Sequence, residues 1–226
     1  RGARFARLAK AGSPWSVTDY GRVSVVRDTT GIKLGLGSDL NKLQTGLMDA
    51  VDAWVEAHPD GNPQFLMLVM DWQVMQLGAF YLPVANDTEG IGQAPFDYDP
   101  SVRLEGLVWL NGDDYLAKSP GYAALLFGQE FGHRWLAFTR YKDTTGQVRN
   151  DLLGRDQAHW SYYLDTNWSW VEGNDWSDNG DGTWTTNLNT FDDVTHYSEL
   201  DLYLMGLIPA EDVSPMTLLD ATSGPQ

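Results

Sequence analysis

The 226-residue chain contains no cysteine, which excludes disulfides, thiolate zinc ligands and cysteine nucleophiles. Positive charge is scarce as well, because 15 Lys and Arg residues stand against 31 Asp and Glu, a formal net charge of −16. Such a chain repels phosphate backbones, so we expect no nucleic-acid partner. Long apolar runs are also missing: none approaches the roughly 18 residues of a membrane span, and we expect no span.

The composition is that of a globular protein, with 42% hydrophobic and 20% charged residues. The length suits one sizeable core, so we predict a single domain over residues 1–226. The chain starts with RGARFARLAK and shows no targeting segment. This is expected of a mature protein, or of a piece of a longer parent chain with further domains.

Residues 1–140 read as alternating strands and helices. Apolar residues spaced by three and four predict helices over 38–58, with Ser38 as the N-cap, and over 120–140, with Pro120 in the first turn. Strands are predicted at 23–27, 65–72, 78–84 and 104–110, the last as an edge strand. Residues 86–98, rich in Gly, Asp and Pro, predict a loop.

Residues 141–226 have a different character. We expect a strand at 158–164, a polar loop at 174–187 and a helix at 197–207. The whole pattern predicts an α+β fold: a mixed twisted sheet packed on two long helices, followed by an irregular, aromatic-rich C-terminal half. No shift in composition between the two halves indicates a domain boundary.

The stretch Gln129-Glu130-Phe131-Gly132-His133 carries the clearest chemistry. It matches the metallopeptidase motif H-E-x-x-H except at the first histidine, where Gln129 stands. Side chains at i and i+4 project from one helix face, so Gln129 and His133 could hold one metal ion. Glu130 would then be the general base that takes a proton from an attacking water. The amide oxygen of Gln129 is a weaker zinc donor than an imidazole.

The chain resembles bacterial zincin-like metallopeptidases. The resemblance rests on five segments within residues 65–210: NDTEGIG (86–92), EFGHRWLAF (130–138), HWSYYLDT (159–166), EGNDWSDNGDGTW (172–184) and SELDLYLMGL (198–207). It implies a zincin-like fold, a zinc hydrolase activity, and a secreted or cell-surface protein. In such a fold residues 1–140 would hold the sheet and the active-site helix, and residues 141–226 would supply the third zinc ligand. An edge strand would bind the extended peptide substrate.

The third metal ligand has several candidates. The metzincin extension H-x-x-G-x-x-H is absent, because Leu136 and Thr139 replace its Gly and last His. A gluzincin-like carboxylate would fall near Asp151 or Asp156. His159 is preferred because imidazole is the stronger zinc donor. The carboxylate alternatives for ligation, or for orienting a histidine, are Glu199 and Asp201.

Two further sites are weaker. Tyr203 could stabilise an oxyanion, although tyrosines more often only pack. The loop around Asp178 and Asp181 carries closely spaced oxygen donors and glycines, so it could bind calcium, but it lacks the EF-hand spacing. A solvated turn held by Asx hydrogen bonds is the competing interpretation of that loop.

Two functions follow from these patterns. The first is a zinc-dependent peptidase in which Glu130 activates a water against a peptide carbonyl. The second is a catalytically impaired descendant that binds a peptide or a glycan. Its stacking platforms would come from the tryptophans of the second half, which are Trp160, Trp168, Trp170, Trp176 and Trp184.

Overall fold

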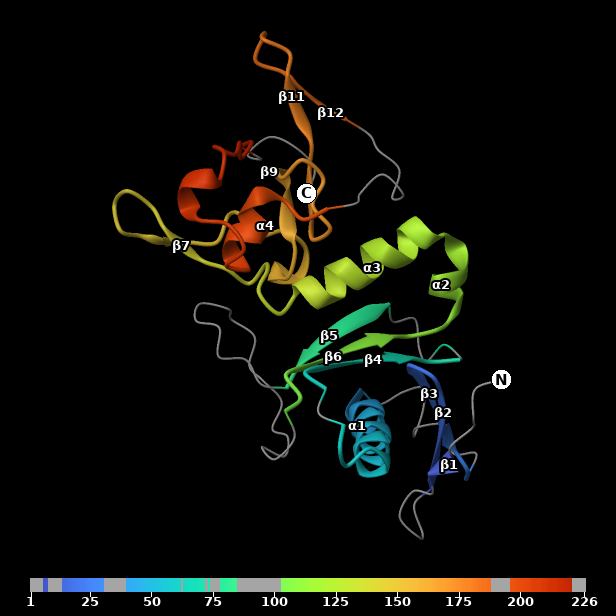
Figure 1. Ribbon diagram of the computed structural model, residues 1–226. Coiled ribbons are helices and arrows are strands. Elements are labelled where there is room, and N and C mark those ends of the chain that lie inside the picture. The colour runs from blue at the N-terminus through green and yellow to red at the C-terminus, as the bar shows by residue number, and fades with distance from the viewer. Residues whose placement is uncertain are drawn as a thin grey trace. The chain divides into compact units, whose positions relative to one another are not determined.

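The computed structural model describes residues 6–7, 14–30, 40–61, 63–71, 73, 78–84, 103–187 and 196–220 (Figure 1). They belong to two compact units, one within Arg1–Pro63 and Gln73–Leu77, the other within Gln64–Trp72 and Gly78–Gln226. Helices mix with several small sheets, which confirms the predicted α+β class. The predicted N-cap Ser38 and the predicted loop at 86–98 lie outside the described residues. Within the described part, no helix is both long and apolar enough to cross a bilayer.

The first unit pairs a small antiparallel sheet with one helix. Strands β1 (Ala6–Arg7), β2 (Trp15–Tyr20) and β3 (Val23–Asp28) lie in that order, and β2 turns into β3 at Gly21, whose φ of 69° suits a glycine. Helix α1 (Leu40–Ala57) covers β2 and β3 and packs Ala53 and Ala57 against Val17. The helix predicted at 38–58 is therefore present.

The second unit begins with a three-stranded mixed sheet. Its strands are β4 (Phe65–Val69), β5 (Ala79–Pro83) and β6 (Gly106–Leu110), and their order is β4-β6-β5. β6 runs parallel to β4 and antiparallel to β5. The prediction of an edge strand at 104–110 was wrong, because β6 is central and buried along its whole length. The edges of the described sheet are β4 and β5.

Helix α3 (Pro120–Gly132) follows the short helix α2 (Asp114–Lys118) and lies across this sheet in Figure 1. Its first turn is fixed by Pro120 and by the side chain of Ser119, which accepts a hydrogen bond from the Tyr122 N–H at 3.0 Å. The prediction that this helix continues to residue 140 was wrong. The chain leaves the helix after Gly132 and turns at Ala137 and Phe138, both with positive φ.

The rest of the second unit is built from short elements around a separate core. Its fully or nearly fully buried members include Leu136, Trp160, Leu164 and Val171. The predicted polar loop at 174–187 contains a hairpin, because Trp176–Asp178 pairs with Trp184–Thr186. The elements are β7 (Tyr141–Lys142), β8 (Val148–Arg149), β9 (Trp160–Asp165), β10 (Glu172–Asn174), β11 (Trp176–Asp178), β12 (Trp184–Thr186) and α4 (Glu199–Leu204).

Candidate active site at the end of helix α3

Glu130 lies in the last turn of α3, with only 4% of its surface exposed. Burial raises the pKa of its carboxyl to about 8, although the charge of Arg155 and a hydrogen bond from the Tyr81 backbone both favour the ionised form. Tyr81 belongs to β5, so the carboxyl faces an edge strand of the sheet. A buried carboxyl with a pKa near neutrality can both accept and release a proton under ordinary conditions.

His133 caps the C-terminus of α3 and is 7% exposed. Burial, followed by the effects of His159 and Arg155, lowers its pKa to about 3, and the backbone of Leu136 opposes this only weakly. The imidazole is therefore neutral at physiological pH. Its Nδ1 is buried, and no described group is in hydrogen-bonding geometry with it.

His159 comes directly before β9 and is also buried. Its Nδ1 lies 3.1 Å from the carbonyl oxygen of Arg155, which can only accept, so Nδ1 carries the proton. Nε2 is then the acceptor, and it is shared by the amide nitrogen of Gln129 and Nη2 of Arg155, each 3.0 Å away. Burial lowers the pKa of His159 as well, so this ring is neutral. A histidine with Nδ1 bonded to a backbone carbonyl and an unprotonated Nε2 is prepared to bind a metal.

These positions bring three of the predicted ligands together. Gln129 and His159 are in direct contact, and the ring centroids of His133 and His159 lie 5.0 Å apart. Gln129 and His133, four residues apart, therefore lie at one end of α3 as the motif predicted. The candidate third ligand, His159, lies beside both.

Two charged residues that the sequence did not single out complete the cluster. Arg155 donates from Nη2 to Nε2 of His159 at 3.0 Å and to Oε1 of Glu172 at 2.5 Å. Oε1 of Glu172 lies 3.9 Å from Nε2 of His159. Glu172 falls in the segment EGNDWSDNGDGTW that carried the family resemblance, but nothing in the local sequence marked Arg155.

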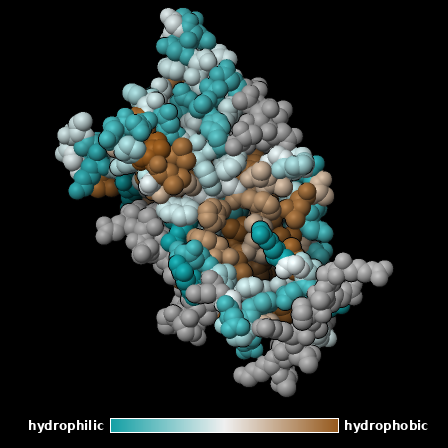
Figure 2. Space-filling view, viewed as in Figure 1, coloured by the Kyte–Doolittle hydropathy of each residue, from teal (hydrophilic) through white to brown (hydrophobic). Residues whose placement is uncertain are grey.

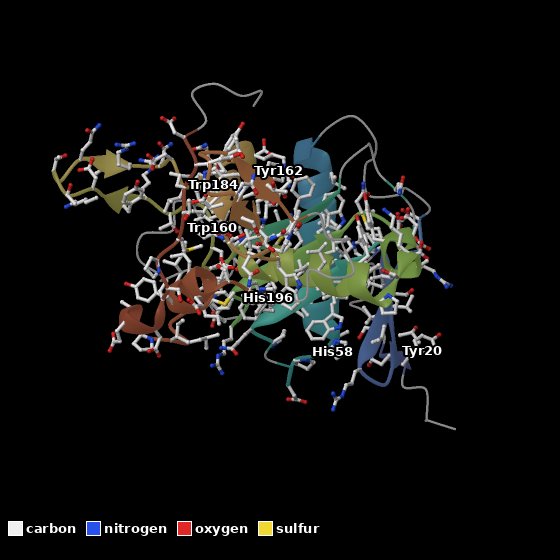
Figure 3. All side chains as sticks on the ribbon, turned by 90° about the horizontal axis from the view of Figure 1, so that it is seen from above. Tyr20, His58, Trp160, Tyr162, Trp184 and His196 are labelled. Carbon is white, nitrogen blue, oxygen red and sulfur yellow. The ribbon has the colours of Figure 1, made fainter. Side chains whose placement is uncertain are left out.

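Asp201 has a structural environment instead. It is fully buried and forms a capping box with Ser198 at the start of α4. Its Oδ1 accepts from the indole of Trp160 at 2.7 Å, and its Oδ2 accepts from the hydroxyl of Ser169 at 2.5 Å (Figure 3 labels Trp160). Both carboxylate oxygens therefore face these donors and not the two histidines.

The remaining predicted residues lie elsewhere. Tyr203 is 42% exposed on α4, and its role as an oxyanion stabiliser stays a prediction. Glu199 accepts from the Ser214 N–H. Asp151 pairs with Tyr141 and Arg149, and the Asp156 side chain is largely exposed. Of these contacts, only the ion pair of Asp156 with Arg155, at 3.4 Å, reaches the cluster.

The predicted calcium loop is held by its own hydrogen bonds. Asp178 accepts from the Gly180 N–H at 2.8 Å, and Asp181 accepts from the N–H and the hydroxyl of Thr183 at 3.0 and 2.5 Å. These are Asx-type turns, which account for the acidic residues without an ion. Calcium binding stays a prediction.

An apolar cavity of about 500 Å³ lies on the opposite side of α3. Figure 2 shows apolar side chains gathered around a hollow in the second unit. From α3 the lining takes Ala124, Phe127, Gly128 and Phe131, spaced by three and four along one helix face. At 100° per residue, Gln129 and His133 project from roughly the opposite face. The cavity is therefore separate from the polar cluster.

The donor set can be compared with the needs of a zinc ion. Donors 2.0–2.1 Å from a tetrahedral ion lie about 3.3 Å from one another. The contact of 3.0 Å joins the amide nitrogen of Gln129 to Nε2 of His159, so the amide would have to turn by about half a turn before its oxygen could serve as a ligand. Within the described residues, moreover, no three His, Cys, Asp or Glu side chains form a group that could hold a metal. The potential donors that lie together are therefore two imidazoles and one amide.

Comparisons with known proteins add no relative: no family model, no curated protein and no solved structure matches this chain.

Proposed function

We propose that this protein is a zinc-dependent hydrolase of the metallopeptidase type, with its site at the end of α3. The observation that carries the proposal is the cluster of two buried, neutral histidines, His133 and His159, in contact with Gln129 and next to the buried Glu130. Neutral imidazoles are costly to bury without partners, and metal ligation is one reason for a protein to keep them.

Gln129, His133 and His159 would hold the ion, which when bound supplies a Lewis acid for a carbonyl and lowers the pKa of a water. Glu130 is the proton carrier. Its carboxylate accepts the proton of the attacking water and passes it to the leaving amine. The Tyr81 N–H fixes the carboxylate between the helix and strand β5. The charge of Arg155 only partly offsets the burial that raises the pKa of Glu130, and a bound metal ion would favour the ionised form that acts as a base.

Strand β5 is the expected substrate-binding edge. Gly78 accepts from Asn111 and Val84 donates to Glu105, so the even-numbered backbone groups face β6. The alternate residues Ala79, Tyr81 and Pro83 therefore face away from it. The Tyr81 N–H is used by Glu130, and Pro83 has no N–H. An extended peptide would pair with Ala79 and the Tyr81 carbonyl, directly beside the catalytic carboxyl.

This arrangement is compatible with a zincin-like fold. An antiparallel edge strand lies next to the helix that carries the glutamate and the ligands, and a later segment brings the third ligand. The resemblance to zincin-like metallopeptidases further suggests a bacterial protein that is secreted or attached to the cell surface.

A non-catalytic peptide- or glycan-binding protein is the alternative. It is favoured by Gln129 at the first ligand position and by the cation Arg155 inside the cluster. The prediction that Trp160 serves as a stacking platform was wrong, because its side chain is fully buried. Tyr162, labelled in Figure 3, is 56% exposed and would be available for stacking.

The test combines metal analysis with a peptide-library digest of the wild-type protein, Glu130→Gln and Gln129→His. We expect bound zinc, cleavage that Glu130→Gln abolishes, and zinc affinity that rises at least roughly tenfold with Gln129→His, because an imidazole is the better donor. Gln147→His, at an exposed glutamine, is the matched control and should leave zinc affinity unchanged.

The alternative function would be supported by a different pattern. If neither the wild-type protein nor Gln129→His retains zinc, and if Glu130→Gln digests peptides as the wild type does, the hydrolase proposal fails. Binding of a peptide or glycan without turnover would then identify the protein as a binding module.

A further inference from the structure

Glu172 is held in a backbone conformation that side chains rarely adopt. Its φ is +73°, in the left-handed region, where a residue with a Cβ is disfavoured by about 1–2 kcal/mol. The next residue, Gly173, has φ +85°, and a Cβ there would come within 2.1 Å of Thr166 Oγ1. The Thr166 hydroxyl donates to the carbonyl of Glu172 at 2.9 Å. The tight turn requires glycine at 173, and the strain at 172 is tolerated beside it, as it is at other described non-glycine residues such as Asn167 and Trp168.

Only one of the two carboxylate oxygens of Glu172 has hydrogen-bond partners among the described residues. Oε1 accepts from Nη2 and Nε of Arg155 at 2.5 and 3.1 Å. Oε2 is buried and has no hydrogen-bond partner among the described residues. A shielded polar atom without a partner costs about 1–3 kcal/mol. The unpaired, buried Oε2, in a carboxylate beside His159, points to a ligand that this carboxylate has yet to meet.

Arg155 contacts two members of the cluster directly. It donates both to the Nε2 of His159 and to Glu172, and its charge acts on Glu130 and His133 as well. The lone pair of His159 Nε2 that receives this N–H is the one that a metal ion would use. Because the side chain of Arg155 is 51% exposed, its guanidinium has room to leave the cluster.

We propose that Glu172 is the carboxylate ligand of the metal site, and that the guanidinium of Arg155 stands in the place that the ion takes. This inference rests on the proposed function and extends its ligand set to His133, His159, Glu172 and Gln129. The distance from His159 Nε2 to Glu172 Oε1 is 3.9 Å, within about 0.6 Å of the edge of a zinc tetrahedron. With Arg155 in place, no three of the described His, Asp and Glu side chains form a group that could hold a metal, so binding of the ion requires the carboxylate to move towards the histidines once Arg155 has released it.

The test measures binding of Co²⁺ and Zn²⁺ to the whole chain, by calorimetry and by the visible absorption of Co²⁺. The variants are Arg155→Met, Glu172→Gln and the double variant. Arg155→Met removes the competing charge but keeps the stem, so metal affinity should rise roughly tenfold or more. Glu172→Gln should lower affinity beyond the roughly 10–100-fold effect of an outer partner, because a direct ligand is lost. The Co²⁺ absorption should change with it.

The double variant separates ligation from simple pairing with Arg155. If Glu172 is a ligand, Glu172→Gln must weaken metal binding in the Arg155→Met background as well. Arg149→Met, at the exposed ion pair with Asp151, is the matched control and should change nothing. Thermal unfolding of each variant tests folding, and Glu172→Asp, a residue that tolerates positive φ, replaces Glu172→Gln if that variant does not fold.

Three results would overturn the inference. Metal affinity unaffected by Glu172→Gln in the Arg155→Met background would make Glu172 only the partner of an arginine. Weaker binding in Arg155→Met would show that Arg155 supports the ion. Both results leave the hydrolase proposal intact if the wild type binds metal. Absence of Co²⁺ and Zn²⁺ binding in the wild type, Arg155→Met and Gln129→His would overturn both proposals together.

Discussion

Replacing Glu130 by glutamine should remove a specific pH dependence of stability in the metal-free protein. The pKa of Glu130 is about 8 in the folded state and near 4.5 when unfolded, so between these values the folded state holds a proton that the unfolded state releases. The free energy of unfolding therefore falls as the pH rises, by up to about 1.4 kcal/mol per pH unit. Stability from this group is fully present below pH 4.5 and is lost towards pH 8.

His133 acts in the opposite direction over a lower range. Its pKa is about 3 in the folded state against 6.5 unfolded, so stability rises with pH between these values. From pH 4.5 to 6.5 the two slopes cancel. Above pH 6.5, Glu130 is the only member of this pair that still changes the free energy of unfolding with pH, so its effect can be measured there separately.

Between pH 6.5 and 8 the wild-type protein should lose about 1.5 kcal/mol through Glu130, and Glu130→Gln should not. Urea denaturation followed by tryptophan fluorescence, in the presence of a chelator, measures both curves. Glu56→Gln, at an exposed glutamate of α1, is the matched control and should follow the wild type. If the Glu130→Gln and wild-type curves run parallel across this window, the carboxyl is not titrating there, and the argument for a poised proton carrier is refuted.

Two further predictions concern the scaffold, and both are measured by urea denaturation. Asp201→Ala should lower the free energy of unfolding by about 3 kcal/mol or more, because it leaves several buried donors unpaired. Glu199→Ala on the same helix should have a much smaller effect, and equal losses would contradict this role. Gly128→Ala should lower the free energy of unfolding by about 1–3 kcal/mol, because the new Cβ would lie 2.2 Å from the Trp170 ring. Gly78→Ala is the control, since a Cβ there meets nothing within 4 Å. Equal stabilities of the two variants would contradict the close contact with Trp170.

Local patterns predicted the elements that are fixed locally. The apolar run at 65–72 became β4, and the spacing of apolar residues found α1. The i and i+4 spacing of Gln129 and His133 and the preference of zinc for imidazole were enough to select His159, which lies in contact with Gln129. The helix and strand predictions depended on periodicity, which a single sequence contains, whereas ligation of a metal by His159 stays a prediction.

Features set by distant contacts could not be predicted in this way. The apolar pattern continues through Leu136 and Ala137, so the sequence favoured a longer helix. In the structure these two residues enter a core with Leu164 and Val171, and the Phe138 N–H bonds to the carbonyl of Gln157. The central position of β6 is likewise a result of pairing with both β4 and β5, which local sequence does not determine.

Asp201 is a different case, because the sequence did contain a signal for its role. Ser198-x-x-Asp201 has the spacing of a capping box ahead of the apolar residues of α4. The box occupies Oδ2, which accepts from the N–H and the hydroxyl of Ser198. Oδ1 instead accepts from the indole of Trp160, a distant contact that the spacing of the cap does not predict.

Gln129 fits both states of the proposed site better than its weakness as a ligand suggests. An amide has a donor end and an acceptor end, which a half-turn exchanges. With Arg155 in the cluster, the amide nitrogen donates to His159 Nε2 at 3.0 Å. With an ion in that place, the amide oxygen would turn inwards and serve as a ligand. A histidine at position 129 would bind zinc more strongly. It could not share Nε2 of His159 with Arg155 as the amide does, so it would also displace the guanidinium. A site that exchanges a guanidinium for an ion therefore has a physical reason to carry glutamine, and Gln129→His should tighten metal binding less in the Arg155→Met background than in the wild type.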